Sequence, residues 1–92
     1  MKEGTKTGSS GERIRIILKE VRPEFEFQEG INFVKSGMLD SLDVINLVVA
    51  LDKEFGISID GLDIIPDNFS SVDSILKLLR KNGISDGSQF SS

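Results

Sequence analysis

Gly37-Met38-Leu39-Asp40-Ser41-Leu42 opens the stretch that decides the fold, and an apolar run follows it as far as Gly56. Asp40 or Ser41 can cap a helix here, because a short side chain with an oxygen accepts the free backbone N–H groups of the first turn. Asp43 places a favourable negative charge near the same end, and Gly56 allows the chain to leave the helix. The stretch predicts one helix of about fifteen residues, roughly 22 Å long.

The predicted helix is apolar on two sides. A broad core stripe is formed by Val44, Leu47, Val48, Ala50, Leu51 and Phe55. Leu42, Ile45 and Val49 lie on a different side. A surface helix needs only one apolar face, so the second is either exposed for a partner or buried by another element, such as the connection over residues 23–39.

Composition limits the possible functions. Ninety-two residues, 38% of them hydrophobic, suit one small domain. The chain has neither cysteine nor histidine, so it lacks a thiolate nucleophile, a disulfide, the usual general base and the commonest metal ligand. We therefore predict no catalytic and no metal-ligating residue. The polar N-terminus and the lack of any apolar run near ~18 residues predict a cytoplasmic protein without a signal peptide or membrane span.

Charge is distributed unevenly along the chain. The net charge is −4, but the segment 40–73 holds eight acids against Lys53 alone. An acidic surface disfavours nucleic acid, which requires a basic patch. It favours partner proteins with basic surfaces, since complementary charge speeds and orients their encounter.

A first helix is predicted before the long connection. Residues 1–11 have almost nothing to bury and are expected to be a disordered lead. Ser9 and Glu12 have the spacing of a capping box. Ile14, Ile17, Leu18 and Val21 then form one apolar helical face. Pro23 ends the helix at Arg22, because the residue before a proline avoids helical geometry.

The connection over 23–39 carries aromatic residues. Phe25 and Phe27 alternate with glutamates, which alone would suggest a short strand, but no second strand pattern exists to pair with it. We expect Phe25, Phe27, Phe33 and Val34 to pin this loop onto the helices.

The remainder predicts a short turn and a third main helix. Ile57 and Ile59 are expected to fill the core from an extended segment, and Pro66 suits the start of a single turn, α-helical or 3₁₀, with Phe69 inward. Ser70 to Asp73 again has capping-box spacing. The third main helix has its apolar face at Val72, Ile75, Leu76 and Leu79 and ends at Gly83. The prediction is an all-α fold, a small four-helix bundle with three main helices, one short helix and a long loop between the first two. We expect one domain over 12–82 and a flexible tail over 83–92.

The triplet Asp40-Ser41-Leu42, the long apolar helix and Phe55-Gly56-Ile57 together resemble the attachment motif of acyl carrier and peptidyl carrier proteins. The resemblance extends over roughly residues 12 to 82. It implies that Ser41 is esterified with 4′-phosphopantetheine from coenzyme A, whose thiol holds acyl or aminoacyl groups as thioesters. It also implies a carrier and not an enzyme. Asp40 would support the site, as a helix cap or by engaging the modifying enzyme and its metal.

The same resemblance implies the partners of the chain. These are a phosphopantetheinyl transferase, and adenylating ligases or ketosynthase-type enzymes with basic surfaces; the carrier itself would be a monomer. The partner-facing residues would be Leu42, Asp43, Ile45, Asn46, Val49 and Asp52. Many fatty-acid carriers have acids where this chain has Asn46 and Lys53. Among fatty-acid, polyketide and peptide-type pathways, this favours a specialised free-standing carrier.

Three alternatives to this interpretation remain open. Ser41 can be an ordinary capping residue. The chain can be an unmodified interaction module that docks through Leu42, Ile45 and Val49. A hydrolase using Ser41 would have no histidine to activate it and would need a lysine base.

Overall fold

The computed structural model of the chain describes residues 9–84, and its first helix, α1, spans Ser10–Val21. The Ser9 hydroxyl accepts a hydrogen bond of 3.2 Å from the N–H of Glu12, as the capping-box spacing predicts. The helix ends before Arg22, which precedes Pro23. The predicted apolar face is confirmed, with Ile14, Ile17 and Leu18 buried and Val21 packed at its edge.

Helix α2 spans Ser41–Phe55, the fifteen residues that the sequence predicts. Its predicted core stripe faces inward: Val44, Leu47, Val48 and Leu51 are buried, while Ala50 and Phe55 are partly buried against them. The helix ends at Gly56, which has a φ of 65°. A side chain is strained in this left-handed conformation, so glycine is the residue that suits the position.

Two 3₁₀ turns follow α2, η2 at Gly61–Asp63 and η3 at Pro66–Phe69. Ile59 and Phe69 are buried as predicted, and Ile57 packs partly against the core. The predicted four-helix bundle with a short fourth helix is not confirmed in that detail: residues 9–84 contain three α-helices, and the turn expected at Pro66 is the 3₁₀ turn η3. The fold of this described part is therefore all-helical.

Helix α3 spans Val72–Lys81 and begins one residue later than the Ser70–Asp73 spacing suggests. The Ser71 hydroxyl caps it by accepting from the N–H of Ser74 at 3.0 Å. Ser70 is not the cap because its hydroxyl donates to the carbonyl of Asp67 at 3.0 Å. The buried residues of α3 are Ile75, Leu78 and Leu79.

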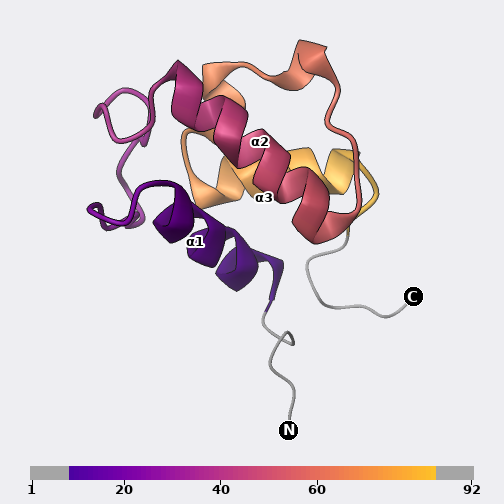
Figure 1. Ribbon diagram of the computed structural model, residues 1–92, viewed down its shortest axis with the longest axis horizontal. Helices are drawn as coiled ribbons and strands as arrows, with labels where there is room; N and C mark the ends of the chain where they lie inside the picture. Colours follow the sequence, from indigo (N-terminus) through magenta and orange to yellow (C-terminus); the bar gives the residue numbers. More distant parts are fainter. Residues whose placement is uncertain (1–8, 85–92) are drawn as a thin grey trace, which may run out of the picture.

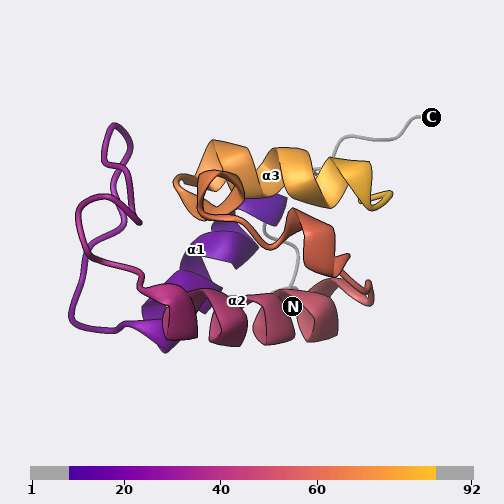
Figure 2. The ribbon, with the colours of Figure 1, turned by 90° about the horizontal axis from the view of Figure 1, so that it is seen from above.

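The three α-helices surround one core. Helix α1 contacts both α2 and α3, which run along opposite sides of the view in Figure 2. The η3 turn contacts both α3 and α2 and so joins these two helices on the side away from α1 (Figures 1 and 2). The core therefore lies between α1, the inner face of α2, α3 and η3.

The long connection between α1 and α2 is held down by its aromatic side chains, as predicted. Phe27 and Phe33 are buried and meet edge to face, with ring centroids 5.0 Å apart. The N–H of Phe33 donates to the carbonyl of Ser70 at 2.8 Å, which ties the loop to the start of α3. Arg15 of α1 donates to the carbonyl of Phe27 at 2.9 Å. Residues 23–39 contain no strand.

The two predicted terminal segments fall mostly outside the described residues. Of the predicted lead, residues 1–8 lie outside, while Ser10 is already helical and buried. Of the predicted tail, 85–92 lie outside, and Ile84 packs partly against the core. No helix within 9–84 combines the length and the apolar character needed to cross a membrane.

Candidate functional site

The N-terminus of α2 is closed by two carboxylates that bond to each other's backbone. Asp40 is the cap, and its Oδ1 accepts from the N–H of Asp43 at 2.9 Å. In the reciprocal hydrogen bond, Oδ2 of Asp43 accepts from the N–H of Asp40 at 3.1 Å. This is a capping box with aspartate at both positions. The sequence left Asp40 and Ser41 as alternative caps, and the structure selects Asp40.

Ser41 is the first residue of α2, and its side chain is exposed. Because Asp40 does the capping, the Ser41 hydroxyl has no hydrogen-bond partner among residues 9–84. The hydroxyl also stands at the positive end of a fifteen-residue helix dipole, where an attached anionic group is electrostatically favoured. An exposed, uncommitted oxygen at this position can accept a covalent phosphodiester without disturbing the packing.

The approach to Ser41 is fixed by the preceding residues. Gly37 turns the chain with a φ of 85°, a conformation that suits glycine. Met38 and Leu39 are then buried, and the N–H of Leu39 donates to the carbonyl of Phe33 at 2.9 Å. Two buried side chains therefore hold the chain immediately before the exposed Asp40 and Ser41.

The pKa of the Asp40 carboxyl is lowered, chiefly by the hydrogen bond from the Asp43 N–H. The positive charge of Arg22 contributes in the same direction. Asp40 therefore stays ionised at neutral pH and keeps its role as an acceptor for the helix N–H groups.

An apolar face lies beside Ser41 on the outer side of α2. We call Leu42, Ile45 and Val49 the α2 face; they are 67%, 51% and 55% exposed. The alternative that the 23–39 connection buries them is wrong, since that loop packs on the core through its phenylalanines. Their spacing of three and four residues places these exposed aliphatic side chains next to one another on one side of the helix, and such an apolar surface can meet a partner.

The other residues expected to face partners differ in exposure. Asn46 is exposed beside the α2 face, whereas Asp52 is half-buried and accepts from the N–H of Ile59 at 3.1 Å. Asp43 is only 7% exposed and is engaged by Asp40 and Arg22. Sequence reasoning missed Arg22. No local signal indicates its contact with Asp43, because the two residues are separated by the whole connection.

A shallow apolar groove runs from Ser41 to the segment after η2. It has a volume of about 190 Å³ and is lined by Ser41, Val44, Ile45, Ile64, Ile65 and Pro66. The groove gives an apolar group attached near Ser41 a surface to lie against.

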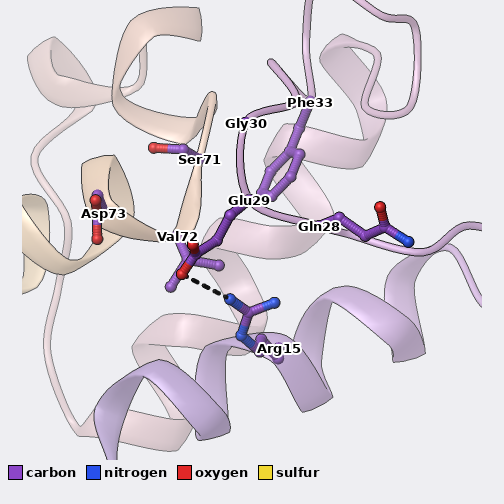
Figure 3. Close-up of a pocket in the computed structure, with 8 residues that line it drawn as sticks. All are labelled: Arg15, Gln28, Glu29, Gly30, Phe33, Ser71, Val72 and Asp73. Carbon is purple, nitrogen blue, oxygen red and sulfur yellow. Dashed lines mark ion pairs between the residues drawn. The ribbon is translucent and has the colours of Figure 1, made fainter.

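A second, polar pocket of about 240 Å³ lies between α1, the loop around Gly30 and the start of α3 (Figure 3). Arg15 and Glu29 face each other across it, 3.9 Å apart. The Ser71 hydroxyl at its edge is committed to the cap of α3. The pocket has charges of both signs, and none of its lining residues belongs to α2. Within 9–84 no cluster of three or more acidic, cysteine or histidine side chains is arranged to hold a metal.

Comparison with known proteins identifies the family. Residues 12–79 match the family model described as "Phosphopantetheine attachment site". Proteins named "Acyl carrier protein" from Rhodopseudomonas palustris strains BisB18 and HaA2 are each 36% identical over 75 residues, which cover 78% of this chain and 91% of each relative. One of the same name from Nitratidesulfovibrio vulgaris (strain DSM 19637 / Miyazaki F) is 36% identical over 52 residues, 56% of this chain and 60% of that protein. No solved structure matches.

The chain belongs to the acyl carrier and peptidyl carrier protein family. Proteins of this family are carriers and not enzymes, and the domain is where 4′-phosphopantetheine is covalently attached. The resemblance seen in the residues around Ser41 is therefore confirmed at the level of the family.

Proposed function

We propose that Ser41 is the attachment point of 4′-phosphopantetheine and that the chain presents acyl or aminoacyl groups to partner enzymes. The observation that carries this proposal is the Ser41 hydroxyl itself, exposed at the first position of α2 and released from capping by Asp40. The domain that does this is proposed to span 12–82, which the family match over 12–79 supports.

The residues around Ser41 suit the group. In the modification, Ser41 Oγ bonds to the β-phosphorus of coenzyme A, 3′,5′-ADP leaves, and the hydroxyl proton passes to a base of the transferase. The helix end stabilises the resulting phosphodiester. When bound, the arm supplies a thiol that carries cargo as a thioester. Asp40 keeps the helix closed beneath it, and the apolar groove offers Ile45, Ile64 and Ile65 to an acyl chain.

The partners proposed are a phosphopantetheinyl transferase, and adenylating ligases or ketosynthase-type enzymes. The α2 face would supply the apolar contact, and the acids of 40–73 would favour basic partner surfaces. Asn46 and Lys53 are both exposed on α2. The exposed side of α2 is therefore less acidic than it would be with carboxylates at these two positions. This supports a specialised carrier over one of bulk fatty-acid synthesis.

Intact-mass spectrometry tests the attachment. The unmodified protein is incubated with coenzyme A and a broad-specificity transferase, and one phosphopantetheine should be added. Ser41→Ala should gain nothing, whereas the matched variant Ser58→Ala, at another exposed serine, should gain the same mass as wild type. No gain in wild type, or a gain that persists in Ser41→Ala, contradicts the proposal.

A second candidate is an unmodified interaction module. The exposure of all three residues of the α2 face favours it, because such a surface can dock a partner without any modification. The interaction module and the phosphopantetheine carrier predict different effects of mutation. Ser41→Ala would leave function intact, while a charge at Val49 would abolish partner binding.

A further inference from the structure

Arg22 and Asp43 form a contact between the end of α1 and the beginning of α2. Arg22 caps the C-terminus of α1, and its Nε lies 3.3 Å from Oδ2 of Asp43. The Nε is buried and makes no hydrogen bond, so the contact is one of charge and not of a formed N–H···O bond. Both charges also suit their helix ends, a cation at a C-terminus and an anion at an N-terminus.

The oxygen that Arg22 approaches is the same one that closes the capping box. Asp43 Oδ2 accepts from the N–H of Asp40, the residue immediately before Ser41. The Asp43 side chain is 10% exposed, and a carboxylate this buried is costly without a positive charge beside it. Without Arg22, it becomes favourable for the Asp43 side chain to rotate into water. Its hydrogen bond from the N–H of Asp40 is then lost, and the capping box opens.

Arg22 is itself held in place from three sides. Its guanidinium carbon lies 5.2 Å from the centroid of the Phe25 ring, and Nη1 is 3.5 Å from a carboxylate oxygen of Glu24. The backbone N–H of Arg22 donates to the carbonyl of Leu18 at 2.9 Å. An arginine fixed by a ring, a carboxylate and its helix can in turn fix the carboxylate of Asp43.

We propose that Arg22 is a positioning residue for the modification of Ser41, acting through Asp43 on the capping box that sets the direction of the Ser41 hydroxyl. This inference rests on the proposed function of Ser41. It assigns Arg22 no contact with coenzyme A or with the transferase. Its effect is to keep the first turn of α2 in one conformation, so that the hydroxyl enters the transferase site with its position already defined.

Arg13 is a matched control for Arg22, because it connects the other end of α1 to the other end of α2. Arg13 near the start of α1 lies over the ring of Phe55, 4.4 Å from its centroid, and its Nε is 2.8 Å from the carboxylate of Glu54. Arg13 and Arg22 each place a guanidinium beside a carboxylate of α2, although Arg13 also donates hydrogen bonds to Glu54 and Arg22 Nε makes none. Only Arg22 makes it beside Ser41.

The experiment compares Arg22→Gln, Arg13→Gln and Arg22→Lys with wild type at a temperature where all are folded. With a fixed transferase, Arg22→Gln should lower kcat for loading by about tenfold and change KM by less than about twofold, because the α2 face still docks. Arg13→Gln should change neither. Arg22→Lys, which keeps a charge beside Asp43, should restore most of kcat. In the unmodified protein, amide hydrogen exchange at Asp40 and Asp43 should accelerate in Arg22→Gln and not in Arg13→Gln.

The outcomes separate the two proposals. If wild type takes up no phosphopantetheine, both fail. If wild type is modified and Arg22→Gln is loaded as fast as Arg13→Gln, only the positioning role of Arg22 is overturned. A loss in Arg22→Gln that appears wholly in KM, or that Arg22→Lys does not relieve, also overturns it.

Discussion

Lys81, the last residue of α3, donates a hydrogen bond of 2.8 Å to the carboxylate of Asp63 in η2. The contact raises the pKa of Lys81, first through the hydrogen bond and then through the negative charge of Asp63. It ties the segment after α2, which borders the groove beside Ser41, to the far end of the last helix.

We predict that Lys81→Gln loosens this segment selectively. Amide hydrogen exchange over 61–65 should rise by roughly two- to fivefold, the size expected for one exposed ion pair, while exchange over 44–55 stays unchanged. Lys77→Gln, one turn earlier on α3, is the control. Even in wild type, 62–69 should exchange faster than 44–55, since two 3₁₀ turns replace a regular helix there; slower exchange would contradict a mobile segment.

The ionisation of Asp40 predicts a specific loss of stability in acid. Its pKa is lower in the folded protein than in the unfolded chain, so folding is favoured above the unfolded value, about 3.9, and this contribution disappears as pH falls through the folded value. Asp40→Asn keeps a good cap but cannot titrate. Urea unfolding between about pH 5 and pH 2 should therefore show a shallower decline for Asp40→Asn than for wild type. Parallel declines would refute the prediction.

A charge on the α2 face should impair docking without unfolding the protein. Val49 is 55% exposed, so Val49→Glu should change the free energy of unfolding by less than about 0.5 kcal/mol. The same substitution should raise KM for the transferase by about tenfold or more, since one apolar contact is replaced by a desolvated charge. Ile16→Glu on α1, where Ile16 is 60% exposed, should leave KM unchanged. Equal effects of the two variants would mean that the α2 face has no special role.

Gly56 should resist substitution although nothing crowds it. Neither Gly56 nor Gly61 has an atom within 4 Å of an added Cβ, but only Gly56 has a positive φ, of 65°. Gly56→Ala should destabilise the fold by roughly 1–2 kcal/mol, lowering Tm by several degrees, because alanine is strained in the left-handed region. Gly61→Ala should have little effect by thermal unfolding. Similar Tm values for both variants would contradict this account.

The sequence predicts what depends on neighbouring residues. The limits of α2 follow from Asp40 and Gly56, and the buried stripes of α1 and α2 follow from the helical period. The period alone left open whether Leu42, Ile45 and Val49 are exposed or covered, and the structure shows them exposed. The family was recognisable from Asp40-Ser41-Leu42 with its helix. Phe69 was predicted to face inward because Pro66 marks the turn that carries it.

The remaining features depend on contacts between distant segments. Asp40 and Ser41 both have capping side chains, and only the geometry of the entering chain, fixed by Met38 and Leu39, decides between them. Leu78 was missed as a core residue because η3 and α1 together enclose more of α3 than one narrow stripe. The contact of Arg22 with Asp43 arises only when the long connection folds back on α1.

The use of Asp40 as the helix cap has a consequence for how folding relates to modification. A serine that closed its own helix would lose that bond on esterification, and acquiring the arm would weaken the fold. On the proposed function, Asp40 has the structural role and Ser41 supplies the reactive oxygen, so the chain needs no modification in order to close the first turn of α2. The proposed modification of Ser41 would then add a group to an already folded domain, and folding and modification could occur in either order.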